Sequence, residues 1–187
     1  MANEHVKLRG VVLTEDRRTE RFFRELLDSL GFDKRKFIFL TAPSGRGNAC
    51  AWVRSQYAHE VNLLRRKRHQ RLCLIAVRDG DNVGVTVRKT EMDDALVEVG
   101  LAPRGKEELI VLPVPTWSIE TWLLGLLARE PNDETISRKR EFEALYSESS
   151  ERDALRNASR DWSTRADQVL TIPSLADGKQ EMKRIHR

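Results

Sequence analysis

The chain of 187 residues lacks the features that mark several classes of protein. Its two cysteines, Cys50 and Cys73, show no Cys-x-x-Cys or Cys/His spacing, so neither a disulfide framework nor a zinc site is expected. No apolar run is long enough to cross a bilayer, and the N-terminus MANEHVKLRG lacks the apolar block of a secretory signal. A Walker motif, internal repeats and low-complexity segments are also missing. We therefore expect a cytoplasmic protein that does not enter the membrane.

The composition is that of an ordinary globular chain. Hydrophobic residues make up 40% of it, which suffices for one core. The formal net charge is +4 and the sequence pI is about 9.3. This mildly basic balance permits a polyanionic partner such as nucleic acid, but it is far from the charge of an arm devoted to DNA.

Short apolar runs alternate with segments of helical periodicity through the first two thirds of the chain. Four of these runs predict strands: residues 8–13, 36–40, 71–77 and 108–114. Each is followed by apolar residues at helical spacing, and Gly31 and Gly100 end two of these helices. Four consecutive strand-helix pairs predict an α/β, Rossmann-like fold over residues 1–130, in which helices cover both faces of a mainly parallel four-stranded sheet.

The composition changes after residue 130. Residues 131–187 are polar, contain no strand-like run and carry only sparse apolar positions such as Phe142, Leu155 and Trp162. We expect a helical C-terminal extension packed on the core.

Acidic residues follow three of the four predicted strands. Glu15 and Asp16 follow the first, Asp79 and Asp81 follow the third within LIAVRDGDN, and Glu120 comes after the fourth. Ligand sites in such sheets lie beyond the carboxyl ends of the strands, so these side chains are expected to converge. Converging carboxylates repel one another unless a cation neutralises them. Because no His or Cys cluster accompanies them, the expected ion is Mg²⁺ or Mn²⁺.

Each acid also has a purely structural explanation. Residues 79–82 are good turn formers, Glu15 or Asp16 can cap the helix that follows, and Glu120 can complement the dipole of its own helix. Their common position at one edge of the sheet favours a functional site, because solvated charges would scatter over both edges.

The order VVLTE, LIAVRDGDN and LPVPTWSIETWLL, within residues 8 to 127, resembles the TOPRIM fold. This is the metal-binding domain of topoisomerases, primases and OLD-family nucleases, and small bacterial TOPRIM-like proteins share it. The resemblance implies that Glu15, Asp79 and Asp81 are metal ligands. It matches Ser118 and Glu120 to the Ser-x-Glu element of OLD-type nucleases, and Lys179, or less well Lys183, to a lysine near the end of the domain.

This chain departs from the family pattern at two positions. Asp16 stands where the family usually has Gly after the first Glu, and the acid usually found one helical turn later corresponds only approximately to Glu20.

Together these features predict a Mg²⁺- or Mn²⁺-dependent nuclease that cleaves or nicks phosphodiester bonds in DNA or RNA. Glu15, Asp79 and Asp81 would bind one ion. Glu120, with Asp16 or Glu20, would complete a second site, although a single-ion site fits the sequence equally well. Lys179 would offset charge in the transition state.

Several arginines are candidates for contacts with the nucleic acid. Arg17, Arg18 and Arg21 follow the first acidic motif, and Arg46 lies in a loop at the same predicted edge. The densest basic run, RRKRHQR at residues 65–71, precedes the third strand and therefore falls at the opposite edge. It is either a solvated helix end or a DNA contact.

Two other functions stay open. The first is a TOPRIM-like binding subunit that works through a separate ATPase subunit, for instance in a phage-defence pair. The second is a phosphoacceptor receiver domain, which also gathers acids after its first and third strands. A receiver needs a lysine after a fifth strand, and no fifth strand is evident here.

Overall fold

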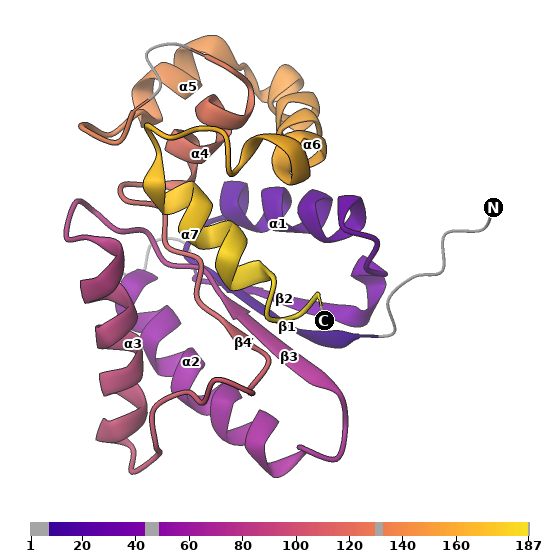
Figure 1. Cartoon of the computed structure of the whole chain (residues 1–187), viewed down its shortest axis with the longest axis vertical. Helices are drawn as coiled ribbons and strands as arrows, with labels where there is room; N and C mark the ends of the chain where they lie inside the picture. The colour runs from indigo at the N-terminus through magenta and orange to yellow at the C-terminus, as the bar shows by residue number, and fades with distance from the viewer. Residues whose placement is uncertain (1–7, 44–48, 130–132, 187) are drawn as a thin grey trace.

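The computed structural model describes residues 8–43, 49–129 and 133–186 (Figure 1). Its sheet contains four strands in the order β2-β1-β3-β4, and every neighbouring pair is parallel. The strands are β1 (Arg9–Thr14), β2 (Phe37–Thr41), β3 (Leu72–Ala76) and β4 (Ile110–Val111). The predicted parallel α/β sheet is confirmed. Among the described residues, no helix is both long and apolar enough to span a bilayer.

The fourth strand is shorter than the prediction of residues 108–114. Pro113 and Pro115 lack the N–H group that a continuing ladder requires, so pairing as a regular strand stops at Val111. The chain nevertheless stays beside β3, because the carbonyl of Pro113 accepts a hydrogen bond from the Arg78 N–H at 3.4 Å.

Helices cover both faces of the sheet (Figure 1). The four that follow the strands are α1 (Arg17–Ser29), α2 (Ala49–Arg66), α3 (Val85–Glu98) and α4 (Ile119–Leu126), and a short 3₁₀ turn, η1 (Lys34–Lys36), precedes β2. Val12 and Ile75 belong to the apolar cluster shared with α1 and α4, whereas Leu13 and Leu74 belong to the cluster shared with α2 and α3. Burial on both faces explains why these strands are continuously apolar.

The C-terminal region is helical and shares the core of the sheet. It contains α5 (Lys139–Leu145), α6 (Glu148–Arg165) and α7 (Pro173–Met182). Helix α6 packs on α1 and α4, and its Trp162 ring lies 5.7 Å from that of Trp122 in α4. Leu155 and Leu175 belong to the same apolar cluster as Val12. The extension therefore completes one face of the sheet rather than forming a core of its own.

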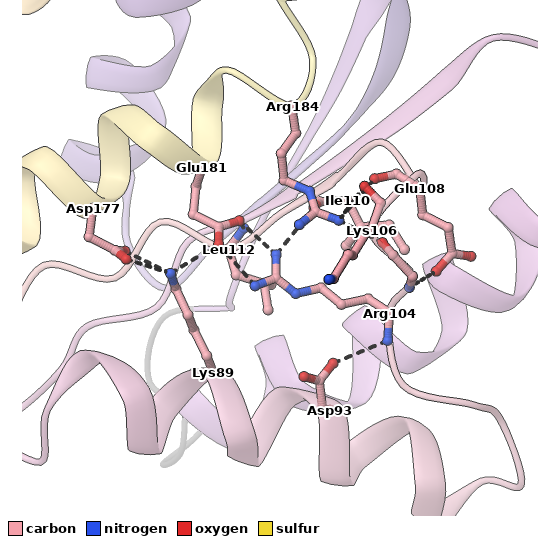
Figure 2. Close-up of polar contacts among 11 residues, drawn as sticks. Lys89, Asp93, Arg104, Lys106, Glu108, Ile110, Leu112, Asp177, Glu181 and Arg184 are labelled. Atoms are coloured by element: carbon pink, nitrogen blue, oxygen red, sulfur yellow. Dashed lines mark hydrogen bonds and ion pairs between the residues drawn. The ribbon is translucent and has the colours of Figure 1, made fainter.

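A buried carboxylate ties α7 to the β4 edge of the sheet (Figure 2). Glu181 accepts hydrogen bonds from Arg104 at 2.6 and 2.9 Å, from Lys89 at 3.0 Å, and from the backbone N–H of Leu112 at 3.1 Å. Burial by itself would raise the pKa of Glu181, but these donors hold that pKa at about 2. Helix α7 thus covers the end of β4. Arg184, just after α7, donates hydrogen bonds to the carbonyls of Gly105 and Lys106 in the loop before β4.

Replacing Glu181 with alanine should lower the free energy of unfolding by about 3–5 kcal/mol, because Arg104 and the Leu112 N–H would stay buried without their acceptor. Urea denaturation at neutral pH measures this loss. The matched control is Glu98→Ala, which removes an exposed partner of Arg54 and should cost about 0–1 kcal/mol. Equal losses in the two variants would contradict the importance of the Glu181 contacts.

Candidate functional site

A cleft of about 750 Å³ opens at the carboxyl ends of β1 and β3. Because these strands are neighbours in the sheet, Glu15 after β1 and Asp79 after β3 reach the same place. Acids of the sheet and of the C-terminal helices line this cleft together: Glu15, Asp16, Asp79, Glu120, Glu143, Glu148 and Glu151. The structure therefore brings together four of the predicted acids and adds three that no local sequence pattern indicated.

The loop after β3 is bound to the loop before α4 by its backbone. The N–H groups of Gly80, Asp81 and Asn82 donate to the carbonyls of Pro115, Trp117 and Thr116 at 2.8, 3.2 and 3.0 Å. A Cβ atom at Gly80 would lie 2.3 Å from the Thr116 oxygen, so only glycine permits this approach. The contact fixes Asp79 beside the start of α4, where Ser118 and Glu120 lie.

The turn-forming explanation of residues 79–82 is also supported by the structure. Asp81 and Asn82 adopt left-handed conformations, with φ of 45° and 62°. The Asp81 side chain is 62% exposed and pairs with Arg88 at 3.0 Å. Asp81 is not among the residues that line the cleft.

Two of the carboxyl groups in the cleft are hard to ionise. Burial raises the pKa of Asp79 well above its usual value, and the charges of Glu15, Asp16, Glu120 and Asp81 raise it further. Burial also raises the pKa of Glu15, to about 7, against the opposing effect of Arg78. Asp79 is therefore the point where the repulsion among these acids is concentrated.

Two buried oxygens at the cleft lack a hydrogen-bond partner among the described residues. They are Oε1 of Glu15 and Oγ of Ser118. That Glu15 oxygen lies 3.8 Å from Nε of Arg78, which is too far for a hydrogen bond. Ser118 occupies the N-cap position of α4, but its side chain makes no capping bond. Buried polar atoms without partners are rare, and at a cleft they indicate a place for a ligand.

Arg18 neutralises several of the acids. Its guanidinium forms a very short contact with the buried carboxylate of Glu120, and it also pairs with Glu151 at 3.0 Å and with Glu143 at 3.4 Å. The same group lies 5.2 Å from the centre of the Phe142 ring. Arg18 thus lies at the predicted edge, and it joins the sheet end to α5 and α6.

Asp16 and Glu20 have local structural roles. Asp16 caps α1 by accepting hydrogen bonds from the N–H groups of Arg18 and Thr19 at 2.7 and 3.0 Å. Glu20 pairs with Arg24 and accepts a bond from the Thr41 hydroxyl. Both carboxylates are therefore already bound to groups of the protein, and neither is free to complete the predicted second metal site.

The remaining predicted residues are only partly brought to the cleft. Arg17 and Arg21 line it, Arg17 as an exposed side chain and Arg21 at 3.4 Å from Glu151. Lys179 is not brought to the cleft: its ammonium donates to the Ser163 carbonyl at 2.7 Å and pairs with Asp167. Arg46 lies outside the described residues.

The donors suit a hard cation, but they are not arranged as a complete ligand set. Within residues 8–43, 49–129 and 133–186, no three His, Cys, Asp or Glu side chains are grouped so that they could hold a metal ion. Asp81 is engaged by Arg88, and Glu120 by Arg18. The oxygen ligands and the unpartnered Glu15 oxygen fit Mg²⁺ or Mn²⁺. In the structure, however, arginines balance the negative charge of these acids.

The chain matches no known family model, no curated protein and no solved structure.

Stability in EDTA should fall as the pH rises from about 4.5 to about 7. An acid whose pKa is raised by folding contributes stability below its usual pKa and loses it as the pH rises through the folded value. For Glu15 that window runs from 4.5 to about 7. Thermal unfolding measures the effect as a declining Tm. Asp79→Asn should flatten the decline, whereas the exposed control Asp94→Asn should not, and a Tm of the native chain that is constant over this range would contradict the assignment.

Gly80→Ala should destabilise the protein by about 1–3 kcal/mol, because the added Cβ forces the two loops apart. Chemical denaturation measures the loss. Gly105→Ala is the matched control, since its Cβ would meet nothing closer than 3.5 Å. A Gly80→Ala protein as stable as this control would refute the close-approach argument.

Proposed function

We propose that this protein is a Mg²⁺- or Mn²⁺-dependent phosphodiesterase that cleaves or nicks nucleic acid at the cleft between β1 and β3. The observation that carries the proposal is the half-buried Asp79, which lies in one cleft with Glu15, Asp16 and Glu120 and next to a Glu15 oxygen without a partner among the described residues. A divalent cation would relieve the repulsion that the surrounding acids impose on Asp79.

Glu15 and Asp79 would be the central ligands. Asp81 and Glu120 can join them only when Arg88 and Arg18 release them, so binding of the ion is coupled to the breaking of ion pairs. Such an ion, when bound, activates water and neutralises a scissile phosphate. The Ser118 hydroxyl, which has no partner among the described residues, is a candidate donor to a phosphate oxygen.

Cations on the rim of the cleft support a substrate with a phosphate backbone. Arg17 and Lys139 line the cleft, and Arg21 lies with them at the start of α1. Arg18 takes the place proposed for Lys179, because Arg18 contacts Glu120 while Lys179 is bound to Asp167. Arg46 stays a candidate from its sequence position alone.

The test is cleavage of supercoiled plasmid and of single-stranded RNA in Mg²⁺, in Mn²⁺ and in EDTA. The native chain should nick or cut one substrate only with metal. Glu15→Gln and Asp79→Asn should each lower the rate on the order of 100-fold or more, as expected for loss of a central ligand. The control Asp94→Asn removes an exposed acid of α3 and should retain full activity.

Equal rates in the native and Asp79→Asn proteins would overturn the proposal. Metal binding is measured separately, as the rise in Tm caused by Mg²⁺. A native chain that Mg²⁺ stabilises in an Asp79-dependent way, but that cleaves neither substrate, would indicate the binding subunit with a separate ATPase instead.

A receiver-like phosphoacceptor is the second candidate, favoured by the strand order. The order β2-β1-β3-β4 is also found in flavodoxin-like folds, and Asp79 follows β3 as a phosphoacceptor would. Against it, the described residues contain no fifth strand, and Lys179 is engaged elsewhere. Incubation with acetyl phosphate tests this candidate. If mass spectrometry detects no phosphoryl group on Asp79, the receiver function is excluded.

A further inference from the structure

Strand β2 forms one edge of the sheet, and within the described part of the chain it pairs only with β1. Its sequence, FIFLT, contains neither a charged residue nor a proline, the usual means by which an edge strand avoids pairing with another chain. Ile38 in the middle of this strand is 62% exposed. By contrast, α7 covers the opposite edge through Glu181, which accepts the Leu112 N–H.

An apolar groove of about 340 Å³ runs beside this free edge. Helix α2 packs on β1 and β3 and leaves the outer part of β2 uncovered on this face. The groove lies between Ile38 and Leu40 of β2 and Leu63 and Leu64 of α2. Its size suits several side chains of an extended segment.

The rim of the groove is basic. Arg9, Lys36 and Lys67 are exposed there, with Glu60 as the only acid among the lining residues. None of the ion pairs among the described residues involves Lys36 or Lys67. The groove continues into a hollow that is lined by Arg68, His69 and Arg71, from the basic run at residues 65–71, and also by Glu107 and Glu108. The groove and the hollow include the amino ends of β1 and β3 and share no lining residue with the acidic cleft.

We propose that β2 and this groove bind an extended, acidic segment of a partner protein, which joins the sheet as a fifth strand. Apolar side chains of the segment enter the groove beside Ile38, and its carboxylates meet Lys36 and Lys67. A strand is the occupant that uses all three features: free backbone groups, an apolar floor and a basic rim. Nucleic acid would use only the cations, and a second copy of this chain would bring its own Lys36 and Lys67 against the same charges.

The full chain is used to select linear peptides of about twelve residues from a displayed library, and their affinities are then measured by fluorescence anisotropy. The enriched peptides should alternate apolar residues with Asp or Glu. Ile38→Lys and Lys67→Glu should each weaken binding about tenfold or more. The matched control Val97→Lys, at a 56% exposed position of α3, should leave the affinity unchanged. Because Ile38 and Lys67 are exposed, these variants keep the fold.

Two further measurements test the mode of binding. Replacing the acids of a selected peptide with lysine should restore affinity for Lys67→Glu. Methylating alternate backbone nitrogens of the peptide should abolish binding in one register and spare it in the other, as strand pairing requires.

The proposal is overturned if no acidic, apolar peptides are enriched, or if their binding ignores Ile38→Lys. A dimer of the free protein that Ile38→Lys dissociates would assign the edge to a second copy instead. Displacement of the peptide by a single-stranded oligonucleotide whose own binding depends on Ile38 would assign it to nucleic acid.

Discussion

The contact on which the candidate site depends is the close backbone approach at Gly80. Three hydrogen bonds join residues 80–82 to residues 115–117, and the glycine leaves no Cβ between the two loops. Because the loops cannot separate without losing these bonds, Asp79 and Glu120 remain near each other although their charges repel. The backbone, rather than any attraction between their side chains, holds Asp79 and Glu120 near each other.

Arginines supply the opposite charge. Arg18 forms ion pairs with Glu120, Glu143 and Glu151. Arg78, which is nearly fully buried, pairs with Glu15 and Glu91. Arg88 completes the set by pairing with Asp81. Arg78 and Arg88 are linked because both pair with Glu91, whereas Arg18 and its three acids form a separate group. The proposed cation would bind by replacing an arginine as the partner of one or more of these carboxylates.

The parallel sheet separates two surfaces of opposite character. The acidic cleft lies at the carboxyl ends of β1 and β3, and the groove beside β2 includes the amino ends of β1 and β3. The two lateral edges also differ, since α7 covers β4 while no described element covers β2. The proposed chemistry and the proposed partner therefore use different sides of the molecule, and both can be bound at once.

The sequence by itself determined the alternation of strands and helices, the parallel sheet and the edge at which Glu15, Asp16, Asp79 and Glu120 meet. These follow from apolar periodicity and from the position of each acid directly after a strand, which are local properties of the chain. Only the tertiary structure decided which charge each acid meets. Arg18 is 102 residues from Glu120 and 133 from Glu151, and no spacing rule connects partners so far apart. The same reason explains why Lys179 lies away from the cleft and why Glu143 and Glu151 belong to it: the packing of α5, α6 and α7 on the sheet fixes their positions.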